Sequence, residues 1–255
     1  ISFLDTAGTT DPADDVWTAN DCEKFQVTVT CNVQAMGLDP DGIMWAAIAG
    51  RGVVWFPADT GAIIDERARR VDLEGGSEED FVDAIAFGPA DDPELADTVW
   101  LGRRRGGLSV LDHQGTLRSR GDDVWDFDRG GPLTSADGLT VDRVQAIVVS
   151  SDGAWLGLGS GYGRPGGLTP VSVVDLAPGE PLRTSNAPPT NFITEIAFGE
   201  AGTRWEGHVW LGTGSRSQRL FGVGAVDLNL GGTLDRSDDV WTLYDKASTD
   251  DDRRA

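Results

Sequence analysis

The sequence predicts an all-β chain built from internal repeats, and evenly spaced tryptophans are the first observation that supports this. Trp45, Trp100, Trp155 and Trp210 follow one another at intervals of 55 residues. Each lies in a short apolar run that leads into glycines, as in VWLGRRRGG and VWLGTGSR. A fixed period of this size is typical of a repeat architecture, in which each repeat is one supersecondary unit.

The second observation is a strand-like pattern around each tryptophan. Upstream runs alternate apolar with polar or small residues, the pattern of a strand with one buried face: VQAMGLD, VDAIAFG, VQAIVVS and ITEIAFG. The tryptophan run predicts a second strand and the stretch after the glycines a third, while DDVWDFD and DDVWTLYD predict a fourth. No stretch shows a convincing helical period, and the 34 glycines suit a turn-rich β protein.

Four short strands per repeat fit the blades of a β-propeller. We predict one domain, 1–255, with four complete four-stranded blades at 33–75, 82–128, 144–186 and 193–245. A blade cannot bury both of its faces alone and must stack on its neighbours. Each of the four tryptophans is therefore interpreted as a packing residue between blades.

The first residues predict a partial blade over 1–20. ISFLDTAGTTDPADDVW matches LSVLDHQGTLRSRGDDVW, which contains a third and a fourth strand. The chain is thus expected to begin in the middle of a blade. The ring is five-bladed if it closes, or else the chain is part of a larger propeller.

These repeats resemble those in the sensor regions of bacterial two-component regulators. The stretches that carry the resemblance are WLGTGSRSQRLFGVGAVD, WLGRRRGGLSVLD and DPDGIMWAAIAGRGVVWF, and it extends over nearly the whole chain. It implies the propeller fold and says little about the ligand. The Gly-Thr step of that repeat is kept only at Gly212-Thr213.

Composition excludes some partners. With 42 acidic and 21 basic residues, the formal net charge is −21, which argues against binding nucleic-acid phosphates over a broad surface. The negative charge also repels anionic membranes. The sequence contains no run of 18 apolar residues, the length that would predict a membrane-spanning helix.

The two cysteines bear on the cellular compartment. Cys22 and Cys31 lie in one connection between predicted blades. A pair confined to one loop predicts a local disulfide and hence an extracytoplasmic protein, either periplasmic or secreted. Two free buried thiols are the alternative.

A candidate binding site follows from the loops that join the second and third strands. These loops share the face around the axial opening of a propeller, and they carry Arg51, Arg103, Arg104, Arg105, Tyr162, Arg164, Arg216 and Arg219. Guanidinium groups pair bidentately with oxyanions, so the set predicts a site for an anionic small molecule or an acidic protein segment. The alternative is that charged residues simply keep the hairpin tips soluble.

The opposite face is expected to collect acidic turns. Calcium prefers several oxygen ligands, which makes Asp39 and Asp41 candidates. Their spacing matches no EF-hand loop, and turn chemistry is the favoured interpretation. No other cofactor is predicted.

A non-catalytic extracytoplasmic binding or sensor propeller is the leading functional hypothesis. His113 and His208 do not occupy equivalent positions, and no nucleophile elbow, P-loop or HExxH segment is present, so no catalytic residue is assigned. A lyase or hydrolase acting on an acidic sugar or ester is one alternative. The other is an assembly module, in which an open half-blade edge pairs with a second chain.

Overall fold

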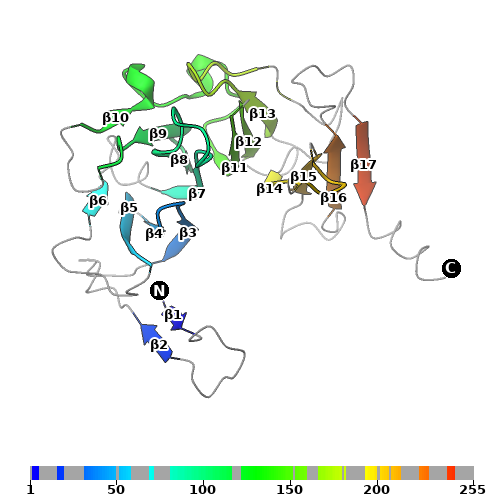
Figure 1. Cartoon of the computed structure of the whole chain (residues 1–255). Helices are drawn as coiled ribbons and strands as arrows, with labels where there is room; N and C mark the ends of the chain where they lie inside the picture. The colour runs from blue at the N-terminus through cyan, green and yellow to red at the C-terminus, as the bar shows by residue number, and fades with distance from the viewer. Residues whose placement is uncertain are drawn as a thin grey trace.

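The computed structural model describes the chain in segments. They are residues 2–5, 16–19, 32–49, 52–58, 69–71, 81–116, 122–151, 153–159, 166–179, 181, 193–199, 202–206, 208–213, 224–229 and 240–244. The strands in these segments form five antiparallel sheets arranged along an open arc (Figure 1). In the described part of the chain, no helix is long and apolar enough to cross a bilayer.

Each sheet is a meander in which consecutive strands pair. The first is a hairpin of β1 (Ser2–Asp5) and β2 (Val16–Ala19). Blade 1 contains β3 (Val33–Leu38), β4 (Ile43–Ile48), β5 (Gly52–Pro57) and β6 (Arg69–Val71). Blade 2 contains β7 (Val82–Phe87), β8 (Thr98–Arg103), β9 (Leu108–Asp112) and β10 (Val124–Trp125).

The remaining sheets complete the arc. Blade 3 contains β11 (Val144–Ser150), β12 (Gly153–Gly159) and β13 (Gly166–Val171). Blade 4 contains β14 (Ile193–Phe198), β15 (His208–Thr213), β16 (Gly224–Asn229) and β17 (Val240–Tyr244). Two short 3-10 turns, η1 (Asp126–Asp128) and η2 (Ser135–Asp137), interrupt the connection from blade 2 to blade 3.

The predicted all-β propeller fold is confirmed, with one difference in strand number. Blades 1, 2 and 4 have four strands each, whereas blade 3 has three in the described residues. An isolated bridge between Val171 and Pro178 lies where its fourth strand was expected. The hairpin of β1 and β2 matches the expected outer half of a partial blade, and no inner strand pairs with it among the described residues.

Apolar residues between successive blades form the core. One cluster around Trp45 joins blades 1 and 2, a second around Trp100 joins blades 2 and 3, and a third around Trp155 joins blades 3 and 4. All three tryptophans are buried, as the repeat predicts. Trp210, their counterpart in blade 4, is only partly buried.

Two different turns satisfy the buried indole N–H groups. The short turn of blade 1 supplies Asp39, whose Oδ2 accepts from Trp45 Nε1 at 2.8 Å. The longer turn of blade 2 ends at Thr98, whose Oγ1 accepts from Trp100 Nε1 at 3.0 Å. A buried donor left without an acceptor costs free energy of folding. The two turns differ in length, but each supplies the acceptor that its tryptophan requires.

Candidate ligand-binding site

The first strand of every blade carries a β-bulge at the same place. The register shifts between Val33 and Ala35, and equivalent shifts occur at 82/84, 144/146 and 193/195. The residue inside each shift is polar: Gln34, Asp83, Gln145 and Thr194. A bulge re-aims a side chain away from its normal alternation, so the repeat presents one polar group per blade near the axis.

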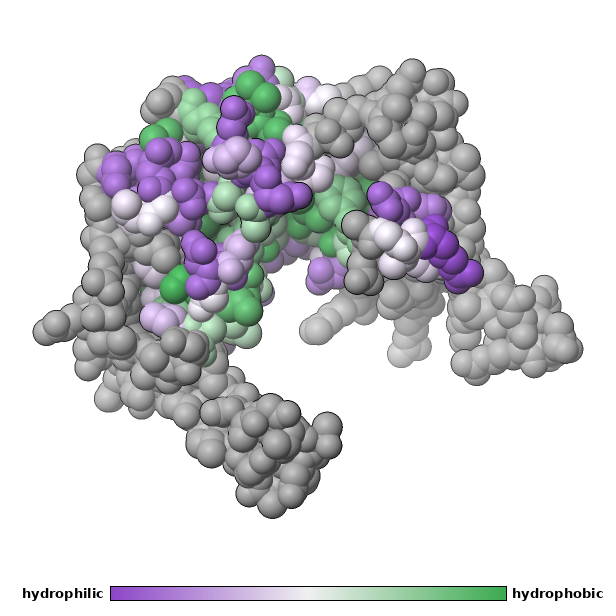
Figure 2. All heavy atoms as spheres, viewed as in Figure 1, coloured by the Kyte–Doolittle hydropathy of each residue, from purple (hydrophilic) through white to green (hydrophobic). Residues whose placement is uncertain are grey.

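The first strands β3, β7, β11 and β14 lie on the inner side of the arc (Figure 1). Together they line a hollow of about 270 Å³. Its polar lining comes from all four blades: Gln34, Asp83, Gln145 and Glu195. Figure 2 shows hydrophilic and apolar residues side by side along this inner side. Among the described residues, no donor reaches the buried Oε1 atom of Gln145.

Asp83 organises one end of this hollow. Its Oδ1 lies 2.7 Å from Arg104 Nη2, and its Oδ2 lies 3.2 Å from Arg143 Nη2. Arg104 Nη2 also donates to Gln34 Oε1 at 2.9 Å. Because Gln34 belongs to blade 1, Asp83 to blade 2, and Arg143 directly precedes β11, the network links three consecutive blades. Two guanidinium groups share one carboxylate that is 10% exposed, and the cluster therefore carries an excess positive charge.

Backbone geometry holds Arg104 in this position. Arg104 follows β8, and its N–H donates to Phe81 O at 2.8 Å. The guanidinium lies 4.7 Å from the centroid of the Phe81 ring, within cation–π range. The loop then turns at Gly107, whose φ of 73° disfavours any residue with a side chain.

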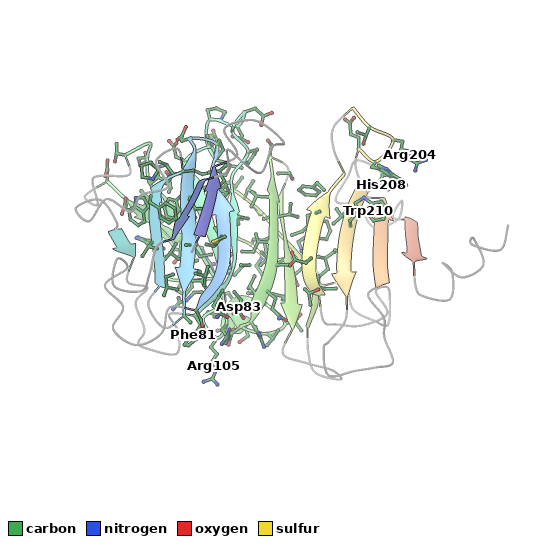
Figure 3. The ribbon with its side chains drawn as sticks, turned by 90° about the horizontal axis from the view of Figure 1, so that it is seen from below. Phe81, Asp83, Arg105, Arg204, His208 and Trp210 are labelled. Carbon is green, nitrogen blue, oxygen red and sulfur yellow. The ribbon has the colours of Figure 1, made fainter. Side chains whose placement is uncertain are left out.

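The predicted arginine face is described in part. Arg104 and Arg105 lie in the β8–β9 loop, and Figure 3 shows Arg105 projecting from the edge that also holds Phe81 and Asp83. Arg103 is placed differently: it is the last residue of β8, is 3% exposed, and donates to Ser109 Oγ at 3.4 Å. The other predicted residues lie outside the described residues: Arg51, Tyr162, Arg164, Arg216 and Arg219. The proposed bridge between Cys22 and Cys31 lies outside them as well and stays a prediction.

The acidic turn of blade 1 shows turn chemistry. Asp39 is buried, and its Oδ1 accepts from the N–H groups of Asp41 and Ile43 at 3.0 and 2.8 Å. Its other oxygen holds the Trp45 indole, so this carboxylate fixes the hairpin and its tryptophan. Within the described ranges, no group of three or more potential ligands forms a metal site.

Asp126 is a buried acid away from the hollow. Its Oδ1 accepts from Val110 N at 2.8 Å. Burial raises the pKa of Asp126 above its usual 3.8, against the lowering effects of that hydrogen bond and of Arg103 and Arg129. A raised pKa beside an arginine would suit an acid catalyst, but Asp126 is not among the residues that line the hollow.

Sequence reasoning missed the axial residues Gln34, Asp83, Gln145 and Glu195, and it missed Arg143. For Gln34, Asp83 and Gln145 the usable signal is the second position of each predicted first strand, where a polar residue follows Val in VQA, VDA and VQA; in ITE that position is Thr194, and the residue that lines the hollow is Glu195 at the third position. Strict alternation would assign these positions to one face of a blade. The bulges change that assignment, and the sequence does not show them directly.

Comparisons with solved structures agree with this architecture. The extracellular domain of a hybrid two-component system from B. thetaiotaomicron matches with a TM-score of 0.60 at 15% identity, over 93% of this chain and 27% of that one. The β-propeller domain of Cps50 (Swd1) from Myceliophteria thermophila matches with a TM-score of 0.55 at 11% identity, over 86% of this chain and 59% of that one.

These likenesses show the fold and confirm the resemblance to the propellers of two-component systems at that level. The chain spans less than two thirds of the length of both matched structures. No family model and no curated protein matches it.

Proposed function

We propose that this chain is a non-catalytic binding or sensor propeller that holds an anionic ligand or an acidic protein segment at the β8–β9 edge. The observation that supports this most directly is the sharing of Asp83 by Arg104 and Arg143. Two guanidinium groups thus share this one carboxylate, beside a hollow whose lining also includes Glu195, in a chain whose net charge is −21.

The ligand's negative group would meet Arg105 first. Arg105 is exposed and projects past the strand ends, whereas the Arg104 guanidinium is held against Asp83, Gln34 and the Phe81 ring (Figure 3). In this arrangement Arg104 and Arg143 supply a fixed positive field, and Arg105 supplies an adaptable contact. The undescribed loop arginines of the other blades would extend the same edge around the axis.

The likeness to an extracellular domain of a two-component system supports a location outside the cytoplasm. An extracytoplasmic sensor module would meet its ligand there. The same location suits the disulfide proposed for Cys22 and Cys31.

Isothermal titration calorimetry of the full chain tests the proposal, with citrate, sulfate and a poly-glutamate peptide as probes. Replacing Arg105 with Ser removes a charge-assisted hydrogen bond worth about 1.5–3 kcal/mol, which weakens binding roughly ten- to hundredfold. Affinity is expected to fall with added salt. Arg204→Ser is the matched control, because Arg204 is also exposed but lies at the opposite edge (Figure 3).

Two outcomes would refute the proposal. One is that none of the three probes binds at low ionic strength. The other is that Arg105→Ser and Arg204→Ser reduce affinity equally, since the net charge of the chain would then explain the effect without a defined site.

A further inference from the structure

Arg104 occupies a position at which the neighbouring blades have small residues. Its N–H donates to the carbonyl oxygen of Phe81, directly before β7. Ala49 and Gly159 make the same backbone hydrogen bond in blades 1 and 3, to the residues directly before β3 and β11. The turn therefore forms with an alanine or a glycine at this place, and the fold does not require an arginine there.

Asp83 departs from the repeat in the same way. It is the bulge residue of β7, whereas blades 1 and 3 have Gln34 and Gln145 at the equivalent shift in register. Because the same bulge forms with neutral residues, the carboxylate of Asp83 is not needed to build it. Charged residues that the repeat does not require, gathered at one junction between blades, point to a role in binding rather than in folding.

Both arginines turn the same side of the guanidinium group to Asp83. Arg104 Nε and Nη2 lie 3.2 and 2.7 Å from Asp83 Oδ1, and Arg143 Nε and Nη2 each lie 3.2 Å from Asp83 Oδ2. Arg104 Nη2 also donates to Gln34 Oε1. A guanidinium group carries five N–H donors in a fixed fork, so these contacts leave the end-on side of Arg143 open.

The end-on donors are available to a ligand. Among the described residues, neither Nη1 of Arg104 nor Nη1 of Arg143 donates a hydrogen bond. The two side chains are 34% and 31% exposed, so a ligand can reach these nitrogens. The two oxygens of a carboxylate match the paired N–H groups at the end of the Arg143 fork.

We infer that the site takes a carboxylate end-on at Arg143, beside Nη1 of Arg104, and that Asp83 sets its preference for a single negative charge. This inference rests on the proposed function, which requires only that some anion binds at this edge. Asp83 lies across the same guanidinium groups from the bound anion and partly cancels their positive charge.

The preference follows from two effects that depend differently on charge. The attraction of an anion to the site grows in proportion to its charge, whereas the cost of removing its water grows with the square of that charge. A site whose positive charge is reduced by Asp83 therefore favours a carboxylate over a doubly charged sulfate or phosphate.

NMR titrations of the isotope-labelled full chain with acetate and with sulfate, at low ionic strength, test the inference. The Nε–H signals of the arginine side chains report the dissociation constant of each anion. The wild type is expected to bind acetate more tightly than sulfate. Asp83→Gln removes the negative charge and introduces the residue that blades 1 and 3 carry at this place. Loss of one charge at about 6 Å should raise the ratio of sulfate to acetate affinity roughly tenfold, because the doubly charged anion gains twice as much.

The ratio of the two affinities separates this role of Asp83 from a structural one. A variant that is partly misfolded binds both anions less, in equal proportion, and leaves the ratio unchanged. Glu195→Gln is the matched control, because Glu195 also lines the hollow but is exposed, and its charge is screened by water and salt. This variant should change the ratio far less than Asp83→Gln does.

Two peptides with blocked ends distinguish the sources of the carboxylate. One contains a single glutamate, and the other has glutamine in its place. The glutamate peptide binds more tightly than acetate if a protein segment supplies the carboxylate, and less tightly if a free acid does. The glutamine peptide is expected not to bind.

The outcomes separate this inference from the proposed function. A wild type that binds neither acetate, sulfate nor the glutamate peptide would refute both. A wild type that prefers sulfate would refute the inference alone. So would an Asp83→Gln chain with an unchanged ratio, a Glu195→Gln chain that changes the ratio equally, or a glutamine peptide that binds as tightly as the glutamate peptide.

Discussion

Replacing Gly102 with Ala tests the close contact between blades 2 and 3. Gly102 lies on β8, two residues after Trp100, and Gly157 occupies the equivalent place on β12. A Cβ added at Gly102 would lie 2.9 Å from both Cγ1 and the carbonyl oxygen of Val144, and 3.1 Å from Ala84 Cβ. The carbonyl oxygen belongs to the paired strand β11, so it cannot rotate away as a side chain can.

The magnitude follows from two opposing effects. Forcing an extra carbon into a packed interior costs typically about 1–3 kcal/mol. Ala also restricts the unfolded chain more than Gly does, which returns about 0.4–1 kcal/mol. We therefore expect Gly102→Ala to lower the free energy of unfolding by about 1–2 kcal/mol, or the melting temperature by roughly 2–8 °C for a chain of this size.

Urea denaturation followed by tryptophan fluorescence measures this difference. Gly131→Ala is the control, because an added Cβ there meets no atom within 4 Å. A double-mutant cycle with Val144→Ala adds a second check, since removal of Cγ1 relieves one of the two close contacts and should reduce the cost of Gly102→Ala. If Gly102→Ala and Gly131→Ala have the same free energy of unfolding, the backbone of β8 at Gly102 does not lie this close to Val144 of blade 3.

Two further predictions concern buried carboxylates. Asp39→Ala removes the acceptor of the buried Trp45 indole N–H and of two backbone N–H groups, so the free energy of unfolding should fall by about 2–3 kcal/mol. Asp41→Ala, at an exposed position in the same turn, should change the free energy of unfolding by less than about 0.5 kcal/mol in the same urea assay. Equal effects of the two would contradict the assigned role of Asp39. For Asp126, the pKa is raised in the folded chain, so the unfolded chain loses this proton at a lower pH and stability falls as the pH rises from about 3.8 to the folded pKa. Asp126→Asn keeps an acceptor for Val110 N–H and abolishes that titration. The free energy of unfolding of the variant relative to the wild type should therefore rise across this pH range. If the two free energies change with pH in parallel, the pKa of Asp126 is not raised in the folded chain.

The sequence predicts most of the fold because its signals are local and recur. Period-two runs and glycine-rich turns place the strands, and equivalent tryptophans identify the faces that pack between blades. The end of β10 shows where local pattern fails. DDVWDFD predicts a strand over 122–128, but β10 stops at Trp125, and Asp126 and Phe127 adopt φ values of 51° and 49°. There the Asp126 side chain satisfies Val110 N–H, which a longer fourth strand would otherwise pair with.

The candidate site was harder to predict, because it depends on contacts between blades. The sequence groups Arg103, Arg104 and Arg105 as one loop cluster. The structure separates them, since Arg103 still belongs to the alternation of β8 and turns inward, whereas Arg104 reaches Asp83 and Gln34 over sequence distances of 21 and 70 residues. Arg143 reaches the same carboxylate across 60 residues, which no local pattern reveals.

The repeat also explains why the residues near the axis vary from blade to blade. Residues that pack between blades must stay apolar and similar in size, because each interface packs around an equivalent tryptophan. The bulge residues do not share that constraint, and they vary as Gln34, Asp83, Gln145 and Thr194. Of these, only Asp83 carries a charge, and it is also the one contacted by two arginines. Any specificity of this propeller for an anion would therefore arise from residues at which the repeat permits variation, on a scaffold that the repeat keeps fixed.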